Sequence, residues 1–238
     1  MKALVLCAGY GTRLGSLTNL IPKPMLPLGG KPMLAHTLHY LVSQGIREIA
    51  VNLHYRPETI RDHFGDGSRF GVALTYSEEP DLRGTAGAVS GLRDFFEGEE
   101  AFLVLYGDVL TNQALDGIFA LHRDNEALAT LVVHRRANSN SRVTMNAEGR
   151  ITAFEERPQV AEPAGDTWVN SGIQILGRDI FEHIPERLPS DLPRDVYVPS
   201  VQTGRLFGHP LSGSRIAIDS PARYQEAERA VLEGRFDR

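Results

Sequence analysis

The chain of 238 residues contains one cysteine, Cys7, so no disulfide bond can form within it. A chain without disulfides suits a reducing compartment, and we expect a cytoplasmic protein. Cys7 stands in an apolar run, which predicts a small buried hydrophobic residue and not a nucleophile. No hydrophobic run reaches the ~20 residues of a membrane span, and the apolar start is too short for a signal peptide, so we expect no membrane partner.

Positive charge is also scarce, because the chain has 25 Lys and Arg and 30 Asp and Glu, which gives a formal net charge of −5. Proteins that bind nucleic acids usually carry a basic patch or a high pI, so we expect no nucleic-acid partner. The eight histidines show no spacing typical of a metal site. An acidic protein that binds phosphates must therefore gather its cations locally.

The order of apolar and amphipathic segments predicts an α/β fold. Strands are expected at 3–8, 48–53, 72–76 and 101–106, and helices near 32–45, 57–64, 85–96 and 112–122. This alternation favours a parallel sheet covered by helices. After about residue 128 the strands are shorter and separated by polar turns, at 128–135, 142–145, 151–154 and 168–176. Loops are expected at 159–167 and 185–193, a short strand at 216–218, and a last helix at about 221–233, capped by Ser220.

A glycine-rich turn with nearby cations follows the first expected strand. It reads Gly9-Tyr10-Gly11-Thr12-Arg13-Leu14, and Pro22-Lys23-Pro24 comes soon after it. Glycines let the backbone approach a ligand, and Arg13 and Lys23 add positive charge, which together predict a nucleotide site. The pre-proline position is expected to keep Lys23 extended. Leu14 replaces the third glycine of a dinucleotide fingerprint, and no segment matches a P-loop.

In these segments and in several later ones, the chain resembles the sugar-1-phosphate nucleotidyltransferases. The resemblance extends over most of the chain in separate patches, at 9–14, 17–18, 22–27, 79–80, 84–88, 107–108, 154–158, 170–173, 195–199, 204–208 and 218–221, with Tyr224. It implies a three-layer α/β/α Rossmann-like fold with a mostly parallel mixed sheet and a small β-rich sugar-binding part. It also implies one domain over 1–238, with a nucleotide-binding half to about residue 127 and a sugar-binding and closing half from about 128.

The resemblance implies an enzyme that joins a nucleoside monophosphate from an NTP to a sugar 1-phosphate and releases pyrophosphate. The Glu79-Pro80 and Gly84-Thr85-Ala86-Gly87 segments most resemble guanylyltransferases for mannose- or heptose-type phosphates, which favours GTP. The partners implied are an NTP and a sugar 1-phosphate, with Mg²⁺ as the cofactor. A homo-oligomer is possible, and it would have to form through this domain.

The same resemblance assigns the residues of the site. The catalytic set is Arg13, Lys23 and Asp108, and the metal ligands are Asp108 and Asp219. The nucleotide-binding set is Leu6, Ala8, Gly9, Gly11, Thr12, Arg13, Glu79, Gly84 and Thr85. The sugar-binding set is Gly107, Glu156, Arg157 and Asn170.

Some positions depart from the family's pattern. Ala217 stands where a metal-binding Asp is usual, and Asp219 stands two residues later in an Ile-Asp-Ser sequence. That sequence resembles cytidylyltransferases acting on non-sugar phosphates or phosphonates, which is an alternative function. The missing acid at Ala217 leaves a second alternative, a catalytically weak nucleotide-sugar sensor or regulatory subunit. Gly15-Ser16 replaces a residue and Pro, which is expected to loosen the loop.

Overall fold

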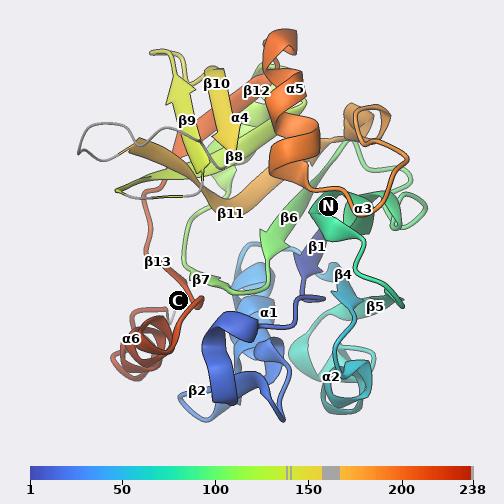
Figure 1. Ribbon diagram of the computed structural model, residues 1–238, viewed down its shortest axis with the longest axis vertical. Coiled ribbons are helices and arrows are strands. Elements are labelled where there is room, and N and C mark those ends of the chain that lie inside the picture. Colours follow the sequence, from blue (N-terminus) through green and yellow to red (C-terminus); the bar gives the residue numbers. More distant parts are fainter. Residues whose placement is uncertain (138, 140, 157–166, 237–238) are drawn as a thin grey trace. The chain divides into compact units, whose positions relative to one another are not determined.

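Figure 1 shows the computed structural model, which describes residues 1–137, 139, 141–156 and 167–236. The chain forms two compact units, the first of Met1–Leu82, Leu105–Ala114 and Ser212–Arg238 and the second of Arg83–Val104 and Leu115–Leu211. The units do not follow a single division near residue 127, because the segments 105–114 and 212–238 return to the first unit. The expected nucleotide-binding and sugar-binding halves of a single domain stay a prediction.

Parallel strands form the centre of the first unit. Strand β4 (Glu48–Leu53) pairs with β1 (Lys2–Leu6) on one side and with β5 (Ala73–Glu78) on the other. Apolar residues of β1 and β4 are buried, as expected for strands covered on both faces. Helices α1 (Met33–Ser43) and α2 (Pro57–Phe64) lie beside these strands (Figure 1).

Shorter elements complete the first unit. They are the 3₁₀ segments η1 (Thr12–Thr18), η2 (Lys23–Met25) and η3 (Ser68–Phe70), the strand pairs β2 (Pro27–Leu28) with β3 (Lys31–Pro32) and β7 (Val109–Thr111) with β13 (Arg215–Ala217), and helix α6 (Pro221–Leu232). The Ser220 hydroxyl accepts a hydrogen bond from the Arg223 N–H at 3.4 Å. This contact confirms Ser220 as the N-cap of the last helix.

The second unit is rich in antiparallel strands. Its strands are β6 (Ala101–Tyr106, of which the last two residues belong to the first unit), β8 (Ala129–Arg136), β9 (Ser141–Met145), β10 (Ile151–Glu156), β11 (Thr167–Gly177) and β12 (Leu206–Pro210). Strand β11 pairs antiparallel with β8 and β9, β10 pairs antiparallel with β9, and β12 runs parallel to β8. The other elements are α3 (Gly84–Ser90), α4 (Asp116–Asp124), η4 (Arg178–Glu182), a π-helical turn (Leu192–Tyr197), α5 (Val198–Ser200) and η6 (Val201–Thr203).

Several expected boundaries change for identifiable reasons. The first strand ends at Leu6 because the Cys7 N–H donates to the Asn52 side chain at 2.7 Å instead of extending the ladder. The helix expected at 85–96 ends at Ser90, and turns follow. The helix expected at 112–122 begins only at Asp116, because the Gln113 side chain binds the segment 212–213. The loop expected at 159–167 lies mostly outside the described residues.

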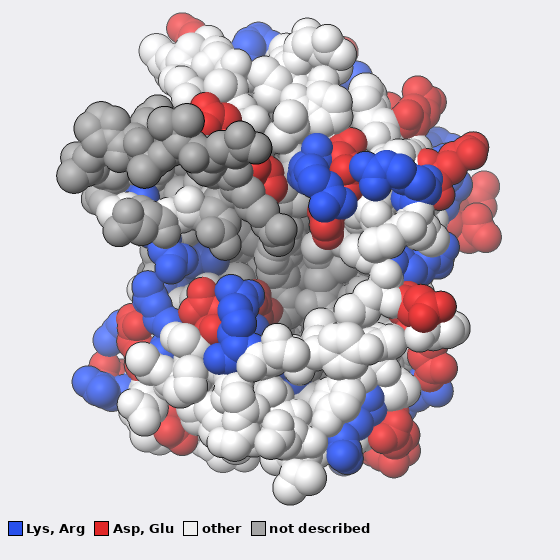
Figure 2. Space-filling view, viewed as in Figure 1, with Lys and Arg blue, Asp and Glu red and all other residues white. Residues whose placement is uncertain are grey.

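No helix in the described part of the chain is long and apolar enough to cross a membrane. Figure 2 shows basic and acidic side chains interspersed on the described atoms of one face. That face therefore carries no broad patch of a single charge.

Candidate active site

The glycine-rich turn of the first unit keeps its backbone donors available. Gly11 adopts φ +69°, a left-handed conformation that favours glycine, and a Cβ there would lie 3.0 Å from the Thr18 side chain. Among the described residues, the backbone N–H groups of Gly9, Tyr10 and Gly11 donate to no protein group. Arg13 is exposed on the same loop. Open amides beside a cation can bind an anion such as a phosphate.

Thr18 stabilises the loop through two hydrogen bonds. Its hydroxyl donates to the carbonyl oxygens of Gly11, at 3.1 Å, and Gly15, at 3.3 Å. Gly15 adopts φ +58° and ψ −129°, which only glycine reaches without strain. Gly15 therefore makes the kink between two 3₁₀ turns, and the expectation that Gly15-Ser16 loosens the loop stays a prediction.

Lys23 and Asp108 form the central ion pair of the first unit. The Lys23 Nζ lies 2.7 Å from Asp108 Oδ2, and the side chains are 12% and 25% exposed. The expectation that Lys23 is extended is wrong, because Lys23 begins the 3₁₀ turn η2 and the preceding Pro22 is the extended residue. The structure thus brings together two of the three predicted catalytic residues.

Gly107, predicted to contact the sugar, has a packing role next to the end of β1. Its N–H donates to the Leu6 carbonyl at 2.9 Å, and a Cβ would lie 2.5 Å from that oxygen and 2.7 Å from Cys7 Sγ. Only glycine fits this approach. Burial, the main cause, and the nearby Asp108 carboxylate raise the pKa of the Cys7 thiol. Cys7 is 7% exposed, which confirms the expected small buried residue, and a raised pKa disfavours the nucleophilic thiolate.

A buried hydrogen-bond chain links the start of the glycine loop to Glu79. Asn52 accepts from the Cys7 N–H at 2.7 Å and donates to Glu79 Oε1 at 2.8 Å. Glu79 is 3% exposed. His54 connects the same region to the loop from the outside, since its Nδ1 lies 2.7 Å from the Glu79 carbonyl and its Nε2 lies 2.6 Å from the Tyr10 hydroxyl. Glu79, a predicted nucleotide-binding residue, is therefore connected through hydrogen bonds to Cys7 and to Tyr10.

The second predicted metal ligand, Asp219, follows strand β13. The Ile218 N–H donates to the Asp108 carbonyl at 2.8 Å, so the backbones of the two predicted ligands run close together. Ala217 lies opposite Val109 in the β13–β7 pair. No group of three or more His, Cys, Asp or Glu side chains among the described residues is placed to hold a metal ion.

In the second predicted nucleotide segment, Gly84–Gly87, backbone N–H groups donate hydrogen bonds to protein groups of the second unit. The Ser190 carbonyl accepts from the N–H groups of Ala86 and Gly87 at 2.9 and 3.2 Å, and Asp191 Oδ1 accepts from the Thr85 N–H at 3.2 Å. Gly84 has φ +75°, and a Cβ there would lie 2.3 Å from the Ser190 oxygen. The first amides of α3 are thus satisfied by protein groups.

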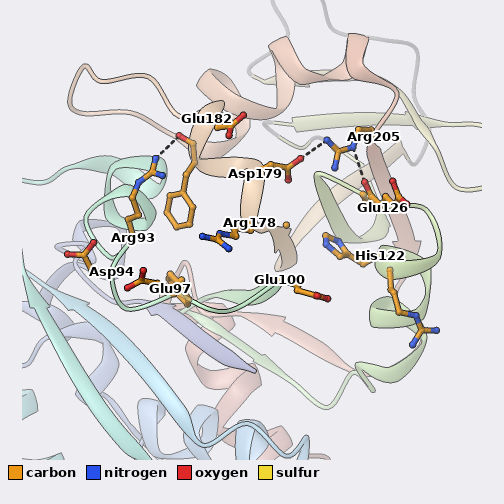
Figure 3. Close-up of a pocket in the computed structure, with 16 residues that line it drawn as sticks. Arg93, Asp94, Glu97, Glu100, His122, Glu126, Arg178, Asp179, Glu182 and Arg205 are labelled. Carbon is orange, nitrogen blue, oxygen red and sulfur yellow. Dashed lines mark hydrogen bonds and ion pairs between the residues drawn. The ribbon is translucent and has the colours of Figure 1, made fainter.

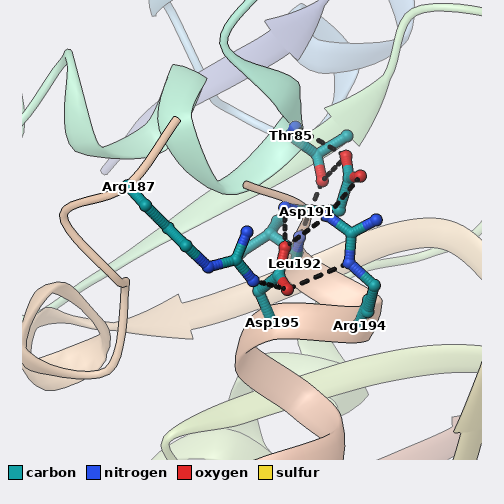
Figure 4. Close-up of polar contacts among 6 residues, drawn as sticks. All are labelled: Thr85, Arg187, Asp191, Leu192, Arg194 and Asp195. Carbon is teal, nitrogen blue, oxygen red and sulfur yellow. Dashed lines mark hydrogen bonds and ion pairs between the residues drawn. The ribbon is translucent and has the colours of Figure 1, made fainter. Parts of the chain in front are cut away.

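Asp195 stabilises the segment 190–192, which binds the start of α3 (Figure 4). Its carboxylate, whose side chain is 4% exposed, accepts from the Asp191 N–H at 2.7 Å and pairs with Arg187 and Arg194 at 2.6 and 2.8 Å. The Thr85 hydroxyl accepts from the Leu192 N–H at 2.8 Å. Chiefly the Arg194 hydrogen bond holds the pKa of Asp195 well below its usual range, against the opposing effect of burial. Asp195 therefore stays charged.

The described sugar-binding residues predicted for the second unit lie on strands β10 and β11, which are separated by β9. Glu156 ends β10 and is half-buried, while Arg157 lies outside the described residues. Asn170 lies in β11, where its Oδ1 accepts from the Gly172 N–H at 2.9 Å and its Nδ2 lies 3.4 Å from Gln174 Oε1. The half-buried amide is thus partly satisfied by local groups, and its sugar contact stays a prediction.

Some residues of these networks were not predicted. Asn52 carried a signal, because it is a polar residue within an apolar strand. Gln174, between Ile173 and Ile175, carried the same signal, whereas Tyr197, whose hydroxyl donates to Gln174 Oε1 at 2.9 Å, carried none. Asp195 stood in a family patch but had been given no role.

The family model for nucleotidyl transferases matches residues 2–195. The chain therefore belongs to the nucleotidyl transferase family, as its motifs indicated. It is 36% identical over 247 residues to a UTP–glucose-1-phosphate uridylyltransferase of Synechocystis and covers 63% of that protein, with 98% of this chain aligned. A mannose-1-phosphate guanylyltransferase of Mycobacterium tuberculosis is 32% identical, with 88% of this chain and 58% of that protein aligned. The chain thus spans about three fifths of the length of these relatives.

Solved structures confirm the fold class. A putative glucose-1-phosphate thymidylyltransferase from Bacillus anthracis matches with a TM-score of 0.85 and 21% identity, covering 100% of this chain and 99% of the other. HddC from Yersinia pseudotuberculosis matches with a TM-score of 0.82 and 23% identity, covering 97% and 99%. The expected Rossmann-like α/β fold with a mixed, mostly parallel sheet is therefore confirmed.

Proposed function

We propose that this protein is a sugar-1-phosphate nucleotidyltransferase that makes an NDP-sugar and releases pyrophosphate. The observation that carries the proposal is the Lys23–Asp108 pair at 2.7 Å beside a glycine turn with open amides. The aligned relatives support a sugar 1-phosphate as the acceptor. Several of them are guanylyltransferases, which favours GTP, although a uridylyltransferase is also among them.

The chemistry needs positioning and charge more than proton transfer. A sugar phosphate is largely a dianion at neutral pH, because its second pKa lies near 6, so it attacks the α-phosphorus without a general base. The open amides of the glycine turn and Arg13 would bind the triphosphate. Lys23 would hold the α-phosphate against the incoming anion, and its charge would offset that of the transition state.

The residues present fit a magnesium ion bound mainly through substrate. Mg²⁺ commonly uses one or two carboxylates together with phosphate oxygens, and Asp108 with Asp219 offers such a donor set. When bound, the ion would neutralise phosphate charge. The Lys23 ammonium would keep Asp108 oriented until substrate arrives.

The test is pyrophosphate release in the presence of magnesium, with each NTP against sugar 1-phosphates, phosphocholine and phosphonates. We expect release with one NTP and a sugar 1-phosphate. Release only with a non-sugar acceptor would replace the proposal with the alternative that Ile218-Asp219-Ser220 suggests. No release, together with binding of a nucleotide sugar, would replace it with a sensor.

Two variants test which residue at the end of strand β13 contributes to magnesium binding. Asp219→Asn should reduce release and raise the magnesium concentration needed, whereas Ala217→Asp should lower that concentration if a second acid is missing. An Asp219→Asn variant with an unchanged magnesium requirement would remove Asp219 from the metal site. Asp116→Asn, on an exposed residue of α4, serves as the control.

A further inference from the structure

A cavity of about 860 Å³ lies wholly within the second unit (Figure 3). It opens where β6 begins at Ala101 and where β11 ends at Gly177. Gly107 and Asp108 belong to the first unit and are not among the residues that line the cavity. None of the residues predicted for nucleotide, sugar or metal lines it.

Three charged side chains at the cavity are solvent-exposed and have no side-chain partner among the described residues. The Arg178 guanidinium and the carboxylates of Glu97 and Glu100 make no side-chain hydrogen bond or ion pair to the described residues. Figure 3 shows Arg178 between Glu100 and the Arg93 side of the cavity. Donors and acceptors that face the same space without pairing can each serve a ligand.

His122 adds a neutral polar group to the wall. It is 6% exposed, and its Nδ1 lies 3.1 Å from the Thr130 hydroxyl, which leaves Nε2 without a partner in the described part of the chain. Burial lowers the pKa of His122 to about 4, so the ring is neutral at physiological pH. A neutral imidazole nitrogen can exchange a hydrogen bond with a hydroxyl group.

The aromatic rings of the cavity are already covered. Phe96 stacks on Phe102 with ring centroids 3.8 Å apart, and the Arg93 guanidinium lies 4.6 Å from the centroid of Phe181. Arg93 also donates to the Phe181 carbonyl at 3.1 Å. The cavity therefore favours a polar ligand over a nucleobase, which would need a free ring face to stack on.

The charges of both signs at the cavity further restrict the class of ligand that it can bind. Arg205 is neutralised by Asp179 at 2.5 Å, whereas Arg178 keeps its full charge for an anionic group. The unpaired carboxylates would repel a ligand that is anionic throughout, but they accept hydrogen bonds from hydroxyl groups. From these contacts we propose that the cavity is a second small-molecule site, which takes a polyhydroxylated anion such as a sugar phosphate or a sugar acid.

In this site Arg178 binds the anionic group, and Glu100 and His122 bind hydroxyls. The proposal does not depend on the nucleotidyl transfer proposed above. The test is calorimetric titration of the full chain with glucose 6-phosphate, glucuronate, inorganic phosphate and uncharged glucose. We expect either or both of the sugar anions to bind more tightly than phosphate or glucose, and the two anions separate a phosphate from a carboxylate as the preferred group.

Variants locate the binding. Arg178→Met should weaken binding of the sugar anion at least tenfold, and Glu100→Gln should weaken it less, while Arg229→Met on the exposed face of α6 changes nothing. Thermal melting checks that each variant is folded. Binding that is unchanged in Arg178→Met but lost in Glu156→Gln would assign the ligand to the predicted sugar site and overturn the proposal. Absence of binding by any probe at millimolar concentration would overturn it as well.

Discussion

Two glycine-rich turns of this chain look alike in sequence and differ in what their backbones do. In the turn at Gly9–Gly11, the amide N–H groups make no hydrogen bond to the described residues. In the turn at Gly84–Gly87, the N–H groups of Thr85, Ala86 and Gly87 all bind the segment 190–191. The first turn is open to a ligand through its backbone, and the second is closed by protein.

The difference separates two reasons for placing glycine near a nucleotide. At Gly84 the structure itself demands glycine, because the Ser190 oxygen occupies the space of a Cβ. At Gly9 no atom lies within 4 Å of an added Cβ and φ is not positive, so the fold does not demand glycine there. A ligand that approaches closely would supply the missing reason. Gly84 is therefore required by packing, whereas the binding role of Gly9 stays a prediction.

The largest effect is expected at the ion pair beside the open turn. Asp108→Asn keeps the shape of the side chain but removes the charge that pairs with Lys23 and that would bind magnesium. We expect the rate of pyrophosphate release to fall about 10³-fold, the scale for losing a key electrostatic contact. Release kinetics at saturating NTP and magnesium measure it, with Asp124→Asn on an exposed pair as the control. A rate within a few-fold of the parent would remove Asp108 from the mechanism.

Gly84→Ala should damage the closed turn through the fold. The new Cβ would lie 2.3 Å from the Ser190 oxygen in a residue with φ +75°, so we expect about 3 kcal/mol of destabilisation and a lower melting temperature. Gly98→Ala is the matched control, because Gly98 has φ +84° but nothing within 4 Å of its Cβ. Gly98→Ala should cost about 1 kcal/mol. Equal losses in both variants would show that backbone strain, and not contact with Ser190, fixes Gly84.

Asp195 sets the pH range over which the closed turn is held. Its folded pKa lies below the unfolded value near 4, so its stabilisation is fully present above about pH 4 and is lost as the pH falls further. Asp195→Asn should therefore lower the free energy of unfolding by about 2 kcal/mol at pH 7, the scale for hydrogen bonds to a charged group.

Denaturant unfolding of the parent and the variant at pH 7 and pH 3 measures this contribution. The difference between the two proteins should shrink at the lower pH, and a difference that grows would contradict the assignment. Asp124→Asn, in a mostly exposed pair with Arg123, should change little at either pH.

Local patterns of the sequence predicted local structure well. The strands at 48–53 and 101–106 and the helix at 57–64 lie where they were expected, because their apolar period and Pro57 at the helix start are signals contained within the segment. The end of the first strand was placed too late, because the group that stops it is the Asn52 side chain, 45 residues away.

In the site, too, the features that depend on local sequence could be predicted, and those that depend on long-range contacts could not. The glycine turn and its cations were visible as a motif, but which aspartate would pair with Lys23 depends on a contact across 85 residues. Family resemblance supplied Asp108, since no spacing rule could. The contacts of Thr85 with Asp191 span 106 residues and carried no local signal, so the closure of the second turn emerged only from the fold.

The smallest effect gives the sharpest test of the open turn. Gly9→Ala adds a methyl group into empty space without backbone strain, so the free energy of unfolding should change by less than about 0.5 kcal/mol. The same methyl group would stand where a phosphate approaches the amides, so we expect the KM for NTP to rise roughly tenfold, the equivalent of about 1.4 kcal/mol. Unfolding in denaturant and steady-state kinetics on one preparation measure both. An unchanged KM would mean that no ligand comes close to Gly9, and the contrast between the two turns would then concern folding alone.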